Sequence, residues 1–208
     1  MPSIINSTTT NGIVVSGDNS GSLQLASNNG TTAVTINGSQ GVQFKNTIGV
    51  GDATPSASGS GITFPATASA STDANTLDDY EEGTWTATLV CPSGTITLNG
   101  ANSISRYTKI GRLVNVSGYI EVNAISSPTG RLTLGGLPFS QIATGGAPVG
   151  TCYFVTTNSF TGVPWALGNG STGIFIDRNA GTGADSAIDL ASAIKSTTEM
   201  YFNFTYTT

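Results

Sequence analysis

Apolar and polar residues alternate in short runs along the first 64 residues of the chain. The runs are Leu23-Gln24-Leu25, Val34-Thr35-Ile36, Val42-Gln43-Phe44 and Ile62-Thr63-Phe64. Alternation with a period of two is typical of β-strands that bury one face. Asn-Gly and similar turn signals separate the runs, which favours tight hairpins. Residues 1–64 are therefore predicted to be a region of short strands.

Each of these strands offers only two side chains to an interior. A sheet of such strands buries too little apolar surface to offset the conformational entropy of about sixty residues. One solution is association, in which three copies pack their apolar faces around a common axis, as in a β-prism or stalk. The alternative is half of a single-chain sandwich that packs on the rest of the chain.

Residues 65–76, with the sequence PATASASTDANT, are small, polar and unpatterned, which is typical of a linker. Residues 77–208 alternate again, and we expect a compact all-β domain, a β-sandwich or jelly roll. The predicted strands cover 84–90, 94–98, 105–109, 112–122, 131–134, 151–156, 163–167, 173–177 and 199–206. In the last strand, Phe202, Phe204 and Tyr206 share one face.

One stretch, residues 184–195, departs from the period of two. Ile188, Ala191 and Ile194 recur at helical spacing, with Asp185 or Ser186 as a possible N-cap. A short helix and a loop are both compatible with this pattern, and neither interpretation carries chemistry.

The charge of the chain limits its partners. Of 208 residues only 9% are charged, with seven Lys plus Arg, twelve Asp plus Glu and a net charge of −5. A nucleic-acid partner requires a basic stripe, and a bilayer span requires about 18 apolar residues; the sequence contains neither. The N-terminal MPSIINSTTTNG lacks the pattern of a signal peptide, so we expect synthesis and folding in a cytosol.

Histidine is absent, which excludes Ser-His and Cys-His nucleophile pairs and removes the commonest ligand of zinc and iron. Cys91 and Cys152 are predicted to be small core residues rather than a disulfide, because cytosolic thiols stay reduced. We expect no cofactor.

Four of the twelve acidic residues crowd into LDDYEEGTW, residues 77–85: Asp78, Asp79, Glu81 and Glu82. A catalytic pair needs two carboxylates that converge across a cleft, and crowded exposed acids stay ionised. A calcium site is a better fit to oxygen ligands, but the spacing lacks the known loop pattern. The third interpretation is architectural: the acids lie at a domain or subunit boundary and pair with Arg106, Lys109 or Arg112.

Aromatic residues near turns are the other candidate binding groups. Trp165 follows a proline in TGVPWALGNG, and Tyr153 precedes it. Both suit a sugar platform, or packing at the edge of the core. Asp177, Asp185, Asp189 and Glu199 are scattered carboxylates that do not single out a catalytic pair.

The sequence contains three motifs, LDDYEEGTW (77–85), RYTKIGRLVNVSG (106–118) and GLPF (136–139). The motifs occur in the same order in a family of bacteriophage virion proteins, which the chain resembles. The resemblance covers residues 77–139 and extends more loosely to the C-terminal MYFNFTYTT. The family is associated with tail fibres, tail spikes and head-decoration proteins, often trimeric, and these motifs bring no catalytic or metal-binding residues. The resemblance implies that Gly111 and Gly136 are turn positions and that the following are core: Trp85, Tyr107, Ile110, Leu113, Val114, Leu137 and Phe139.

The resemblance implies a non-enzymatic structural protein on the exterior of the virion. Because the sequence is short and has no heptad or collagen-like shaft, the leading hypothesis is a homotrimeric capsid decoration, or cement, protein bound to the major capsid protein. The alternative is a tail fibre or spike that recognises host surface polysaccharide, with Trp165, Tyr153 or the acidic stretch at its contacts. A third hypothesis is a polysaccharide depolymerase.

Overall fold

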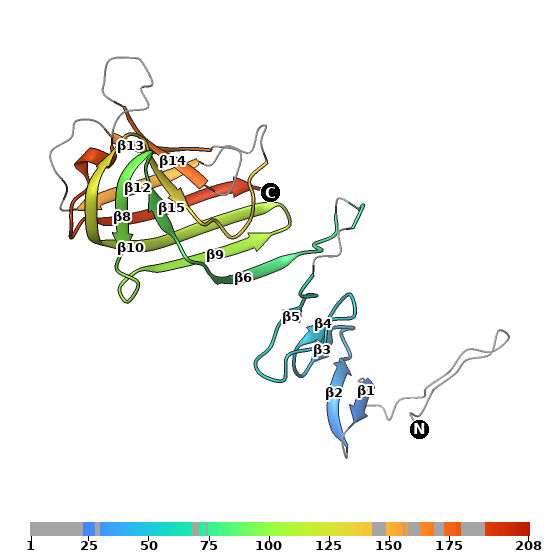
Figure 1. Ribbon diagram of the computed structural model, residues 1–208. Coiled ribbons are helices and arrows are strands. Elements are labelled where there is room, and N and C mark those ends of the chain that lie inside the picture. The colour runs from blue at the N-terminus through green and yellow to red at the C-terminus, as the bar shows by residue number, and fades with distance from the viewer. Residues whose placement is uncertain are drawn as a thin grey trace. The chain divides into compact units, whose positions relative to one another are not determined.

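The computed structural model describes residues 23–27, 30–67, 71–73, 75–142, 149–155, 157, 163–168, 173–179 and 190–208. The chain divides into two compact units, Met1–Ala68 and Ser69–Thr208. Both units are built from β-strands (Figure 1), which confirms the predicted all-β fold class. The one helical element in the described residues is a single 3₁₀ turn, Ala191–Ala193.

The first unit contains a three-stranded antiparallel sheet in the order β1-β2-β3 and a short parallel pair, β4-β5. The strands are β1 Leu23–Ser27, β2 Thr31–Ile36, β3 Val42–Phe44, β4 Ile48–Gly49 and β5 Ile62–Thr63. They coincide with the four alternating runs of the sequence, with one further strand, β4. The turn between β2 and β3 is stabilised by Asn37, whose side-chain oxygen accepts hydrogen bonds from the backbone N–H groups of Ser39 and Gly41.

One face of the three-stranded sheet is entirely apolar. Across the three strands, one row of paired residues is Leu25, Val34 and Phe44. The row beside it is Leu23, Ile36 and Val42. We call these six side chains the apolar face: Leu23, Leu25, Val34, Ile36, Val42 and Phe44. Its four side chains on β1 and β3 are between 39% and 55% exposed. The apolar face therefore remains open to solvent in the single chain.

The second unit is one ten-stranded antiparallel sheet in the order β6-β9-β10-β15-β12-β13-β14-β11-β7, with β8 paired to β10. Its strands are β6 Tyr80–Thr84, β7 Thr88–Val90, β8 Ser93–Leu98, β9 Ile104–Ile110, β10 Leu113–Thr129, β11 Leu132–Gly135, β12 Val149–Val155, β13 Val163–Gly168, β14 Gly173–Asn179 and β15 Glu199–Thr207.

This sheet folds over on itself around a single core. The long strand β10 pairs with β9 and β15 through its first half and with β8 through its second half, where the register shifts twice. Such irregularities bend a strand. Buried side chains of β10 and β15 therefore share one hydrophobic cluster with those of β11 and β14, from the other end of the sheet. The result is two packed layers (Figure 1).

Most predicted strands are confirmed, with two corrections. The predicted strand 84–90 is wrong, because the chain leaves β6 after Thr84 and re-enters the sheet only at Thr88. The predicted strand 112–122 continues to Thr129. The proposed helix over 184–195 falls largely outside the described residues, and its described end carries only the 3₁₀ turn.

The core predictions are confirmed except at one hairpin. Val114 and Leu137 are buried, and Trp85, Tyr107 and Phe139 are partly buried against the core. Ile110 and Leu113 are about half exposed, at 48% and 50%, so their assignment to the core is wrong. The physical reason is the period of two: since Val114 points inward, its neighbour Leu113 and the cross-strand partner Ile110 point outward.

Two glycines hold the predicted turn positions. Gly111, between β9 and β10, and Gly136, after β11, have φ values of +55° and +78°. This left-handed region is open to glycine at little cost. Both cysteines are free and pack against the core, and burial raises the pKa of the Cys152 thiol to about 12.

The last strand alternates as predicted, and its buried Tyr206 makes stability depend on alkaline pH. Burial raises the pKa of the Tyr206 hydroxyl to about 12, whereas an unfolded tyrosine titrates near pH 10. The stabilising contribution is therefore complete below pH of about 10 and is lost as pH rises towards about 12.

We expect the free energy of unfolding to fall more steeply across this window in the wild type than in Tyr206→Phe, as measured by urea unfolding at a series of pH values. At neutral pH the variant loses the hydrogen bond from the Tyr206 hydroxyl to the Phe139 carbonyl (3.1 Å) and about 1 kcal/mol. Parallel pH profiles for the two proteins would contradict the prediction.

Candidate functional site

The acidic stretch forms the outermost strand of the large sheet. β6 pairs with β9, and two carboxylates, one just before β6 and one within it, hold it there from the core side. Asp79 forms an ion pair with Lys109, and both side chains are nearly buried. Glu81 accepts a hydrogen bond from the Tyr107 hydroxyl. The Lys109 ammonium also lies 5.4 Å from the centre of the Phe139 ring, a cation–π distance.

The other two carboxylates have local partners. Glu82 accepts a hydrogen bond of 2.7 Å from the Tyr80 hydroxyl two residues earlier. Asp78 accepts one of 2.6 Å from the backbone N–H of Ser71. The four acids thus have four separate partners and do not converge on one point.

This arrangement favours the architectural interpretation of the stretch. Charged side chains on a terminal strand discourage pairing with a strand of another molecule. Of the three cations predicted as partners, Lys109 forms an ion pair, whereas Arg106 lies on the outer surface of the sheet. The described residues contain no group of three or more His, Cys, Asp or Glu side chains suited to hold a metal ion.

The Glu81 contact can be tested through its effect on Tyr107. The hydrogen bond to Glu81, burial and the carboxylate charge together raise the pKa of Tyr107 above its ordinary value. In Glu81→Ala we expect this pKa to fall towards about 10, with a stability loss of about 1 kcal/mol or less. NMR of ring-labelled tyrosine would report the titration. Glu82→Ala is the matched control and should move the pKa of Tyr80 only.

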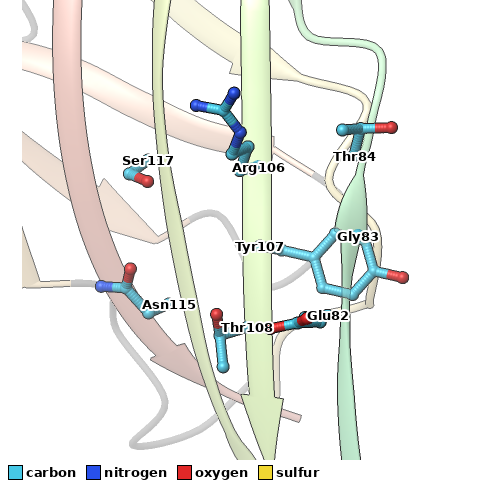
Figure 2. A pocket seen from close by; sticks show the side chains of 8 residues that line it. All are labelled: Glu82, Gly83, Thr84, Arg106, Tyr107, Thr108, Asn115 and Ser117. Carbon is cyan, nitrogen blue, oxygen red and sulfur yellow. The ribbon is translucent and has the colours of Figure 1, made fainter. Parts of the chain in front are cut away.

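Side chains that point away from the core form the outer face of β6, β9, β10, β15 and β12. A hollow of about 440 Å³ lies on this face (Figure 2). It is lined by Glu82, Gly83, Thr84, Arg106, Tyr107, Thr108, Asn115 and Ser117. Of the four acidic residues that the sequence predicted as possible contacts, Glu82 is therefore the one that borders this hollow.

At the edge of the hollow, Gly83 leaves room for an aromatic ring on the core side of β6. Gly83 lies opposite Tyr107 in the register of β6 and β9. A Cβ atom at Gly83 would stand 2.8 Å from the Tyr107 hydroxyl oxygen and 3.0 Å from the ring, so the Tyr107 side chain would have to shift to admit it. Figure 2 shows the ring beside Gly83 at the edge of the hollow.

The hollow offers hydrogen bonds from groups of several kinds. One cation, Arg106, and one carboxylate, Glu82, lie among hydroxyl groups and the Asn115 amide. Asn115 donates to the Asn203 side-chain oxygen at 2.8 Å and to the Thr205 hydroxyl at 3.0 Å, which continues the polar surface onto β15. Such a surface suits a ligand rich in hydroxyl groups.

Tyrosines lie beside this polar surface. Tyr119 of β10, Tyr201 of β15 and Tyr153 of β12 stand opposite one another in register, and we call them the tyrosine row. Tyr153 is 66% exposed, so it is not edge-of-core packing. The sequence singled out Tyr153 but missed its two partners, which only the strand register reveals. The backbone of Trp165 pairs with Thr151, and the Trp165 side chain is outside the described set.

The scattered carboxylates have structural contacts. Asp177 is 4% exposed and is held by the Arg131 guanidinium, whose Nε donates to Oδ1 at 2.7 Å while Nη2 donates to Oδ2. Glu199 accepts a hydrogen bond from the Tyr201 hydroxyl at 3.2 Å. Asp185 and Asp189 lie outside the described residues.

Comparison with known proteins gives one structural likeness. The chain is similar to the crystal structure of the Dettilon tailspike protein (gp208), with a TM-score of 0.56 and 23% sequence identity. The likeness covers 77% of this chain and 31% of that one, so the chain spans about a third of the length of the tailspike. No family model and no curated protein matches the sequence. Within the described residues, no helix has the length and apolarity needed to cross a membrane.

Proposed function

We propose that this chain is a non-enzymatic structural protein of a bacteriophage particle, carried on the outside of the tail as part of a spike that contacts the host surface. The structural likeness to a tailspike over most of the chain carries this proposal. The motif order LDDYEEGTW, RYTKIGRLVNVSG and GLPF supports it from the sequence. This proposal places the tail first, where the sequence analysis placed capsid decoration first.

The proposed structural role agrees with the contacts of the carboxylates. Asp79 and Asp177 form ion pairs, and Glu81 accepts a hydrogen bond from a tyrosine. In each case the acid connects two segments that are distant in the sequence. We therefore propose that these acids serve the fold and that the protein does not cleave polysaccharide. Release of reducing ends from host polysaccharide by the purified protein would contradict this part.

Capsid decoration remains the second candidate because of the first unit. The apolar face presents four side chains that are 39% to 55% exposed on two strands of a neutral sheet. Such a face suits a stable interface with other copies or with a shell protein. In the tail proposal the same face holds the copies of a homotrimer together.

Locating the protein on intact particles separates these candidates. Cryo-EM averaging of particles, with the second unit fitted to density, should show it on the tail. Density repeated over the icosahedral shell at three-fold positions would replace the tail assignment with that of a cement protein. Absence of the chain from purified particles would contradict both.

A further inference from the structure

We propose that the tyrosine row and the polar surface next to it form a binding site for a neutral carbohydrate chain. This inference rests on the proposed host-contacting function and adds the ligand class and the residues that bind it. Tyr119, Tyr201 and Tyr153 come from three adjacent strands and stand opposite one another on the outer face. Because adjacent strands lie about 4.8 Å apart, the row extends over about 10 Å.

The rings are open to a ligand. Tyr201 and Tyr153 are 46% and 66% exposed, and the ring centres of Tyr119 and Tyr201 are 4.9 Å apart. Exposed aromatic rings in a row present apolar surface to the C–H faces of sugar rings, and their hydroxyl groups remain available for hydrogen bonds. Since the rings are held on strands and not on loops, little conformational freedom is lost when a ligand binds.

The groups around the row favour hydroxyl-rich ligands over an apolar protein surface. Glu121 and Glu199 stand opposite each other at one end of the row. On the other side, Ser117 and Asn203 follow at the next outward positions, next to the hollow. An apolar partner would bury these polar groups without hydrogen bonds, which is costly, whereas sugar hydroxyls can donate to the carboxylates and accept from the amide.

The charges at the end of the row disfavour an acidic sugar. The two carboxylates there repel a negatively charged group that lies on the rings. Glu121 is held in place by the Asn102 amide, which donates to it at 2.6 Å, and Glu199 accepts from the Tyr201 hydroxyl. Both carboxylates are therefore oriented acceptors beside the rings, and they suit the hydroxyl groups of hexoses better than uronic or sialic acids.

The test uses the purified 208-residue chain on a glycan array that contains neutral hexose, N-acetylated amino-sugar, amine-bearing and acidic oligosaccharides. We expect binding to neutral members and weaker or no binding to acidic ones. For the neutral ligand identified, Tyr201→Ala and Tyr153→Ala should each weaken binding by about tenfold or more, while Tyr153→Phe, which keeps the ring, should stay close to the wild type.

The control is Val90→Ala. Val90 is also a large exposed side chain, at 49%, but it lies on β7, the last strand in the sheet order, outside the row and the polar surface, so its variant should bind as the wild type does. Circular dichroism would show that all variants remain folded. The inference is overturned if no member binds, if acidic or amine-bearing members bind best, or if the Tyr201 and Tyr153 variants bind unchanged. The array assay needs no phage particle, so it tests the binding site independently of the location of the protein. If the protein lies on the tail but binds no member of the array, only the carbohydrate inference is overturned. If the protein lies on the shell but binds a glycan through these tyrosines, only the tail assignment is overturned.

Discussion

Replacing Arg131 by alanine is expected to lower the free energy of unfolding by about 3–5 kcal/mol, a large fraction of the stability of a typical domain. Arg131 precedes β11, and its guanidinium makes two hydrogen bonds to Asp177 on β14. It also lies 3.8 Å from the centre of the Phe175 ring. Because Asp177 is 4% exposed, removal of Arg131 leaves a buried carboxylate without its counter-charge. Urea unfolding at neutral pH would measure the loss.

Two further variants show whether the buried charge is the cause. In the double variant Arg131→Ala with Asp177→Asn, most of the loss should be recovered, since the uncompensated charge is gone. Arg131→Lys should lie between wild type and alanine, because an ammonium keeps the charge but cannot reproduce the two parallel hydrogen bonds or the ring contact. A loss below about 1 kcal/mol for Arg131→Ala would mean that the pair does not support the fold.

The sequence predicts the strands of this protein because their side chains alternate. β15 is the clearest example, since Met200, Phe202, Phe204 and Tyr206 are buried and the residues between them are not. The same rule explains the error at the hairpin between β9 and β10. Ile110 and Leu113 are large and apolar, and hydrophobicity alone assigns them to the core, whereas alternation with Val114 places them outside.

The candidate site was less predictable because it depends on register between distant segments. Tyr119 and Tyr201 are 82 residues apart in the chain and become neighbours only when β10 pairs with β15. Likewise, the role of the acidic stretch depends on β6 being the outermost strand, which local sequence does not specify. Residue type indicated which side chains could bind or pair, and only the pairing of strands decided which of them meet.

The second large effect concerns assembly through the first unit. Phe44 lies in the apolar face, in register with Val34 and Leu25, and is 45% exposed in the single chain. If this face packs against other copies, Phe44→Asp places a carboxylate in an apolar interface in every subunit, where it has no counter-charge. We expect the proposed homotrimer to dissociate, with an association constant at least about 10³-fold lower per interface. Analytical ultracentrifugation over a range of protein concentrations would measure it.

The same strand supplies the matched control. Gln43 precedes Phe44, is exposed, and points to the opposite, polar face of the sheet, so Gln43→Asp adds the same charge without entering the apolar face. This variant should remain a trimer. If both variants stay trimeric, the apolar face is not the interface between copies, and if both dissociate, the added charge acts on the first unit as a whole. Dissociation of Phe44→Asp alone assigns the interface to the apolar face, since the two variants differ only in which side of β3 carries the carboxylate.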